Sequence, residues 1–246
     1  MEFRAVGGVN VMDLDDAKVA EAGKLIRVKG FKVGCVTSPI GKTKTTDPFE
    51  PDIPKLHKMA EFGRTLGTDF IRVFSWYIPK GEAPEKWRKE TLDRIKKLTA
   101  AAEKERVTLI LENEGELYGD TVERCIELIE AVNSPRLALV YDPGNLIVTG
   151  PKPFTESYPL ARPHIRYFHV KDWSKARKAM VPAGEGDAEW PPILKDLAKT
   201  GWSGIIALEP HLEAAGKFSG FSGPDLFRKA HTALTGLMRA AGMEFR

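Results

Sequence analysis

The sequence has few cysteines and no long apolar run, and each shortage excludes a class of protein. Its 246 residues include two cysteines, Cys35 and Cys125, too few for a disulfide framework and too far apart for a CxxC motif. No stretch approaches the length of a membrane span, and the start lacks the charged region and apolar run of a signal peptide. We therefore expect reduced cysteines, no membrane partner and a cytoplasmic location.

The sequence also lacks a strong charge of one sign and a phosphate-binding glycine motif. The net charge is +3 with 29% charged residues, and no Lys/Arg-rich block suggests a nucleic-acid partner. No G-x-G-x-x-G follows an early strand, so the usual dinucleotide fingerprint is missing. With 42% hydrophobic residues and no linker or low-complexity tract, residues 1–246 are expected to form one domain.

What the chain does contain is a regular alternation of apolar runs and helical patterns. Seven short runs are typical of buried strands, at 3–6, 32–36, 70–75, 108–113, 137–142, 167–172 and 205–210. Strands that are apolar on both faces and alternate with helices favour an α/β fold with a parallel sheet covered by helices. A doubly wound open sheet and a closed (β/α)₈ barrel both fit. The missing dinucleotide motif favours the barrel.

Four consecutive late strands each carry a potential metal ligand at or near their end. These residues are Glu112, Asp142, His169 and Glu209, each about one βα unit from the next, with Glu114 as an alternative to Glu112. In a barrel, neighbouring strands deliver such side chains to the same end, where barrel enzymes hold their active sites. The spacing therefore predicts one cluster of three carboxylates and one imidazole.

A single carboxylate after a strand has a simpler explanation. In "LALVYDPGN" (137–145), Asp142 precedes Pro, Gly and Asn, all of which favour turns, so it could merely cap a helix. Four such residues in register are harder to explain, because burying several carboxylates is costly unless a cation compensates them. The donor set suits one divalent ion, Mn²⁺ or Mg²⁺ first, with Co²⁺ or Zn²⁺ as alternatives.

Several short motifs resemble one known family. They are "SPIGK" (38–42), "IRVFSWY" (71–77), "LENEGELYGDT" (111–121), "YDPGN" (141–145), "HVKD" (169–172), "VPAGEGD" (181–187) and "LEPHL" (208–212). In this order they resemble the xylose-isomerase-like TIM barrels, often called sugar phosphate isomerases/epimerases, over nearly the whole chain. The resemblance implies metal ligands at Glu112, Asp142, His169 and Glu209.

The resemblance also implies catalytic roles. In members that epimerise keto sugars, the first and last metal-bound glutamates exchange protons with the substrate carbon on opposite faces, which here are Glu112 and Glu209. A metal on the carbonyl and hydroxyl oxygens stabilises the enediolate, and a carboxylate near the carbon takes and returns a proton.

Four further residues are candidates for substrate binding. Lys171 shares the strand parity of His169 and could hold a substrate oxygen, or form a surface salt bridge. Glu185 and Asn145 could contact hydroxyl groups, or serve only their turns. Lys42 could meet a phosphate or carboxylate of the substrate, or be solvated.

The chain departs from the family in its strand number. Its first residues resemble the family's second strand, so we predict an incomplete TIM-type (β/α)₈ barrel with seven strands, lacking the first strand and helix. An unclosed parallel sheet has exposed edges. We place the opening between strands 3–6 and 205–210.

The leading hypothesis is a metal-dependent isomerase or epimerase of a small carbohydrate, a keto sugar or sugar phosphate. A dehydratase of a keto-inositol or sugar acid, or a non-catalytic barrel remnant, is the alternative. A related DNA-repair endonuclease with a zinc cluster needs many histidines, whereas this chain has five. Because family members often pair, a homodimer is a further expectation.

Overall fold

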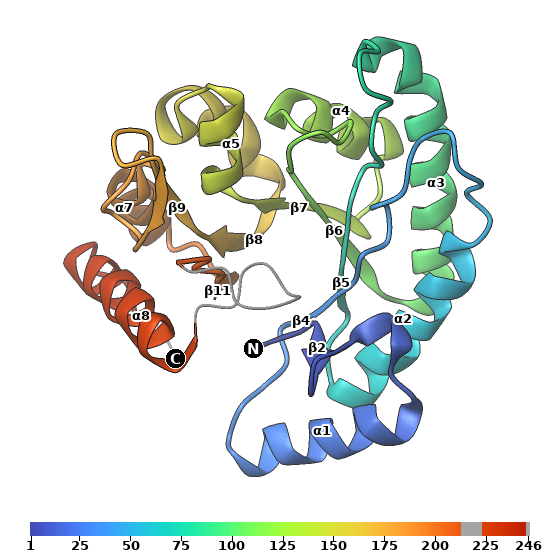
Figure 1. Ribbon diagram of the computed structural model, residues 1–246, viewed down its shortest axis with the longest axis horizontal. Helices are drawn as coiled ribbons and strands as arrows, with labels where there is room; N and C mark the ends of the chain where they lie inside the picture. Colours follow the sequence, from blue (N-terminus) through green and yellow to red (C-terminus); the bar gives the residue numbers. More distant parts are fainter. Residues whose placement is uncertain (213–222, 245–246) are drawn as a thin grey trace.

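In the part of the chain that the structure describes, seven parallel strands form one curved sheet, with the longer helices packed around its outer side (Figure 1). The computed structural model describes residues 1–212 and 223–244. Within these residues the strand order is β1 (Glu2–Phe3), β4 (Cys35–Thr37), β5 (Phe70–Val73), β6 (Thr108–Glu112), β7 (Leu137–Tyr141), β8 (Ile165–Val170) and β11 (Ile205–Leu208). Each neighbouring pair is parallel. The predicted incomplete barrel of seven strands is confirmed.

The helices follow the strands in the expected alternation. They are α1 (Asp16–Val28), α2 (Asp52–Leu66), α3 (Arg88–Glu105), α4 (Val122–Val132), α5 (Pro143–Thr149), α6 (Tyr158–Ala161), α7 (Trp190–Thr200) and α8 (Gly223–Ala240). Two small hairpins, β2–β3 (Ala5–Val6, Val9–Asn10) and β9–β10 (Asp172–Ser174, Ala179–Val181), lie outside the main sheet. None of the described helices is long and apolar enough to span a membrane.

One local prediction needs correction. The run 3–6 is not one strand, because Glu2–Phe3 joins the main sheet while Ala5–Val6 turns back to pair with Val9–Asn10. The helix after β6 begins at Val122 and is capped by Thr121, whose hydroxyl accepts from the Arg124 N–H.

The sheet ends at β1 and β11, where the sequence placed the opening. A cavity of about 390 Å³ lies there, bounded by Glu2, Gly34, Tyr167 and the β11 residues 205–208. All four residues of β11 are only half-buried, whereas β6 and β7 are buried throughout. The two end strands therefore leave one side of the barrel open in the part of the chain that the structure describes.

Side chains alternate along each strand and make two cores. The larger core lies between the outer face of the sheet and the helices. The smaller fills the barrel interior with Cys35, Ile110, Val140 and Tyr167, against which Phe70, Ile205 and Ala207 pack. Because side chains two residues apart share a face, the residues that follow these by two positions point to the same interior, nearer its carboxyl end. We call this smaller core the apolar floor, because the polar residues that follow on the same strands stand above it, at the carboxyl end of the barrel.

One glycine in the loop after β4 is held against the backbone of the neighbouring strand. At Gly41 φ is +84°, and an added Cβ would lie 2.2 Å from the Phe74 carbonyl oxygen. Gly81 has the same φ of +84° but no atom within 4 Å of the Cβ position. Gly81→Ala should therefore cost only the left-handed penalty of about 1–2 kcal/mol.

Gly41→Ala should lower the free energy of unfolding by at least about 3 kcal/mol, because the loop must also move away from β5. Urea denaturation of the two variants measures the difference. Equal losses would show that this loop shifts without cost and is not fixed against β5.

Candidate metal centre

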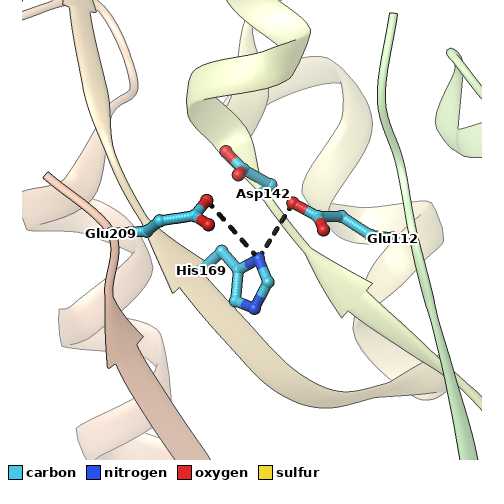
Figure 2. A group of neighbouring side chains, drawn as sticks. All are labelled: Glu112, Asp142, His169 and Glu209. Carbon is cyan, nitrogen blue, oxygen red and sulfur yellow. Dashed lines mark hydrogen bonds and ion pairs between the residues drawn. The ribbon is translucent and has the colours of Figure 1, made fainter. Parts of the chain in front are cut away.

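Four side chains converge at the carboxyl ends of four strands (Figure 2). Glu112 ends β6, Asp142 follows β7, His169 lies in β8 and Glu209 follows β11. Each offers one ligand atom, and these atoms all lie within 4.8 Å of one another. The first three side chains are buried and that of Glu209 is 13% exposed. The structure thus brings together the four residues that the strand spacing predicted, in a group that could hold a metal ion.

The position of each carboxylate follows from the strand below it. Ile110, Val140, Tyr167 and Ala207 form the apolar floor, and the four cluster residues stand two positions later on the same strands. In register, Glu112 pairs with Val140 and Ala207 with His169, so the four side chains are staggered along the barrel axis. The stagger brings the four side chains together although β6 and β11 are not neighbours in the sheet.

Asp142 serves two purposes through its two oxygens. Its Oδ1 caps α5 by accepting from the Asn145 N–H at 3.1 Å. Its Oδ2 is buried without a hydrogen bond, in ion-pair contact with Lys171 Nζ at 2.9 Å. The helix-cap explanation and the ligand explanation of this residue are therefore compatible, because each uses a different oxygen.

Lys171 joins two carboxylates of the cluster. Its Nζ lies 2.9 Å from Asp142 Oδ2 and 2.9 Å from Glu209 Oε2. Burial by itself lowers the pKa of Lys171, but the two carboxylates outweigh it and the pKa is raised well above its usual value. Burial raises the pKa of Asp142 to about 7, although Lys171 opposes the rise. For Glu209, burial acts upward, but Lys171 and His211 bring the pKa well below its usual value.

His169 lies between carboxylates on both sides of its ring. Its Nδ1 is 2.9 Å from Glu112 Oε1 and 3.9 Å from Glu209 Oε2, and its Nε2 is 2.9 Å from Glu2 Oε1. Burial lowers the pKa of His169, but Glu112 and Glu2 raise it further, to well above its usual value.

Arg72 holds the other oxygen of Glu112. The Arg72 guanidinium donates to Glu112 Oε2 at 2.9 Å and to the Ser38 carbonyl at 3.3 Å, and its side chain is buried. Burial raises the pKa of Glu112, but His169 and Arg72 overcome this and lower it to about 2. Glu112 is therefore ionised at neutral pH.

Sequence reasoning missed Glu2 and Arg72. Arg72 gave a signal, since a charged residue within the apolar run "FIRVFS" is almost never buried without a partner. Glu2 gave none, because it lies in a strand of two residues and its partner is 167 residues away along the chain.

The buried donor set fits a divalent cation. Three carboxylates and an imidazole are the ligands that Mn²⁺ and Mg²⁺ accept, and Zn²⁺ also binds such groups. The buried Asp142 Oδ2 has no hydrogen bond, and Asp142 belongs to the group whose ligand atoms lie within 4.8 Å of one another. Both the chemistry of the donors and this oxygen therefore fit a divalent metal ion.

The other predicted residues have distinct surroundings. Lys42 pairs with Glu114 at 2.6 Å, both about one-third exposed, so Glu114 faces Lys42 while Glu112 lies in the cluster. The Asn145 side chain donates to the Asn113 carbonyl at 2.8 Å, beside the cap of α5. Glu185 accepts from Arg177 at 3.2 Å on the exposed hairpin side. Of the four substrate-binding candidates, Lys171 contacts the cluster through its side chain and Asn145 through its backbone N–H.

Comparison with models of known families assigns the chain to one of them. Residues 1–234 match the model of the family described as "Xylose isomerase-like TIM barrel". The chain belongs to this family.

A curated relative among these xylose isomerase-like barrels is the probable L-ribulose-5-phosphate 3-epimerase UlaE of Mycoplasma pneumoniae. It is 27% identical over 191 residues, which are 75% of this chain and 62% of the relative. An Escherichia coli L-ribulose-5-phosphate 3-epimerase is 24% identical over 65% of this chain and 56% of its own. The chain spans about three fifths of the length of these relatives.

Solved structures share the fold at low sequence identity. A D-tagatose 3-epimerase-like protein has a TM-score of 0.77 at 16% identity, covering 98% of this chain and 88% of its own. The probable 3-DHS dehydratase AsbF of Bacillus anthracis has 0.73 at 20%, covering 89% and 82%. The IOLI protein, crystallised with a zinc atom, has 0.73 at 16%, covering 92% and 83%.

Proposed function

We propose that this chain is a metal-dependent isomerase or epimerase of a small carbohydrate, a keto sugar or sugar phosphate. The observation that carries the proposal is the pair of ionised carboxylates, Glu112 and Glu209, that approach one cluster from β6 and from the end of β11. The similarity to a ribulose-phosphate epimerase supports the same reaction class. Glu112, Asp142, His169 and Glu209 would hold one divalent ion, with Mn²⁺ or Mg²⁺ as the first choice.

Glu112 and Glu209 act as the acid/base pair. Epimerisation removes a proton from a carbon beside a carbonyl on one face and returns a proton on the other face, so it needs two groups on opposite sides. Glu112 and Glu209 approach His169 Nδ1 from different strands, at 2.9 and 3.9 Å. When bound, the divalent ion supplies Lewis-acid stabilisation of negative charge on the substrate oxygens.

The remaining residues orient the substrate and the pair. His169 and Arg72 keep Glu112 ionised, and the ionised form is the one that can take a proton. Lys171 presents a buried ammonium beside Glu209, where it can donate to a substrate oxygen. Lys42 would meet a phosphate or carboxylate of the substrate after releasing Glu114, and Asn145 and Glu185 would contact hydroxyl groups.

Metal content and proton exchange test the proposal together. Purified protein given MnCl₂ should retain about one ion per chain by mass spectrometry, and Asp142→Ala should retain none, because it loses an essential buried oxygen. L-Ribulose 5-phosphate, D-tagatose and D-psicose are then incubated in D₂O and followed by proton NMR. We expect a second epimer to form with deuterium on the inverted carbon.

Three results would change this conclusion. Loss of water from a keto-inositol or sugar acid, with no epimer, would identify the chain as a dehydratase that uses the same residues. Metal binding without exchange on any of these substrates would reject the epimerase. A chain that binds no metal and exchanges no proton would be a non-catalytic barrel.

A further inference from the structure

We propose that Glu2 positions His169 for metal binding by accepting the hydrogen of Nε2, which leaves Nδ1 free to face the other ligands. The inference rests on the proposed metal centre and adds a residue from β1, a strand that supplies none of the four ligands. Glu2 would be a positioning residue, since it acts through His169 and does not touch the reacting atoms.

The two nitrogens of His169 have carboxylate partners on opposite sides. Nδ1 lies 2.9 Å from Glu112 Oε1 and faces the cluster, whereas Nε2 lies 2.9 Å from Glu2 Oε1. A neutral imidazole carries one N–H, and a metal ligand needs a lone pair on the other nitrogen. With a metal ion bound, Nδ1, which faces the cluster, would supply the lone pair, so the one hydrogen of the ring would reside on Nε2, where Glu2 accepts it.

Without Glu2, the arrangement would favour the wrong tautomer. The remaining carboxylates at the ring, Glu112 at 2.9 Å and Glu209 at 3.9 Å, both face Nδ1 and would attract the hydrogen to the position that must be free for the ion. Glu2 provides the competing acceptor at Nε2. A carboxylate at the second nitrogen of a metal-binding histidine also raises the basicity of the ligand.

The packing around His169 keeps the ring in the plane that this contact needs. The Tyr167 ring meets the imidazole edge-on, with centroids 5.7 Å apart and planes at 86°. The His169 side chain is fully buried, and that of Glu2 is 16% exposed beside the barrel opening. β1 is hydrogen-bonded to β4 with Glu2 opposite Cys35, so the strand itself fixes where the carboxylate stands.

Metal affinity measures the contribution of Glu2. Calorimetric titration with MnCl₂ should give a dissociation constant about 10- to 100-fold higher for Glu2→Ala than for the wild type. Glu2→Gln, whose amide oxygen can still accept from Nε2–H, should recover part of this loss. Glu105→Gln is the matched control. Glu105 also contacts a histidine, with its Oε1 2.6 Å from His57 Nδ1, but this pair lies outside the cluster. The affinity of this variant for Mn²⁺ should therefore equal that of the wild type.

Ring ¹⁵N NMR separates positioning from a general structural role. With ZnCl₂ bound, the wild-type His169 should show a protonated Nε2 and a metal-bound Nδ1. In zinc-bound Glu2→Ala the Nε2–H should exchange rapidly with water, because its acceptor is gone, while Glu2→Gln should retain the slowly exchanging Nε2–H of the wild type. A role limited to fold stability would lower the melting temperature and leave both the tautomer and the affinity unchanged, and this result would overturn the inference.

The outcomes distinguish this inference from the function on which it rests. If the wild type and Asp142→Ala both fail to bind Mn²⁺, the metal centre and the role of Glu2 are rejected together. If the wild type binds, Asp142→Ala does not, and Glu2→Ala binds as tightly as the wild type, only the role of Glu2 is rejected. Weakened binding in Glu2→Ala, with partial recovery in Glu2→Gln, supports both.

Discussion

Glu209→Gln is expected to lower the turnover of a ketose substrate by about 10² to 10⁴-fold, the usual contribution of a general acid or base. The amide keeps the size of the side chain and an oxygen that can bind a cation, but it cannot take or return a proton at neutral pH. Glu112→Gln should have an effect of the same order, with an added loss of stability because Glu112 is buried against Arg72.

Proton exchange identifies the face on which each glutamate acts. In Glu209→Gln, Glu112 can still remove and return a proton on its own face, so one of the two epimers should take up deuterium from D₂O without being inverted. Glu112→Gln should show the same behaviour with the other epimer. Metal content, measured on the same samples, separates lost chemistry from lost metal.

Two results would contradict this assignment. Normal turnover in either variant would remove that glutamate from the reaction. Loss of exchange with both epimers in both variants, at full metal content, would mean that the two carboxylates do not act on separate faces.

The sequence could predict the strands and the converging ligands because both depend on local patterns. Apolar runs alternating with helical segments indicate a parallel sheet, and a strand-end carboxylate keeps its position whatever the rest of the fold does. Glu112, Asp142, His169 and Glu209 were found in this way, and the structure places them within one cluster. The seven-strand count followed from the same patterns.

The polar contacts around the cluster could not be predicted, because they depend on which side chains face each other across the barrel. Arg72 reaches Glu112 from the neighbouring strand, while Glu2 reaches His169 from β1, far away in the chain. Strand register and the stagger of the barrel decide such pairs, and neither is encoded in residue spacing. The pairing of Lys42 with Glu114 has the same origin.

Lys171→Met should reduce the free energy of unfolding of the metal-free protein by about 3–5 kcal/mol, the usual cost of leaving buried charges without their partner. Lys171 is buried and contacts both Asp142 and Glu209 at 2.9 Å. Met has a similar length and no charge, so the variant removes the cation with little change in packing. Urea denaturation in EDTA measures the loss.

Lys42→Met is the matched control. Lys42 also contacts a carboxylate, at 2.6 Å, but it and Glu114 are each about one-third exposed. Solvent screens such pairs, so the control should lose no more than about 1 kcal/mol. A similar loss in both variants would show that water or protonation compensates Asp142 and Glu209 when Lys171 is removed.

Added Mn²⁺ should then restore more stability to Lys171→Met than it adds to the wild type. In the wild type, Lys171 already neutralises part of the charge of Asp142 and Glu209, so the ammonium and the ion compete for the same oxygens. In the variant, the ion is the only cation beside these two carboxylates, and its binding energy adds directly to the folded state. A larger gain in the free energy of unfolding for Lys171→Met than for the wild type would show that Lys171 compensates the two carboxylates of the metal-free centre. Equal gains would place the ion away from Asp142 and Glu209.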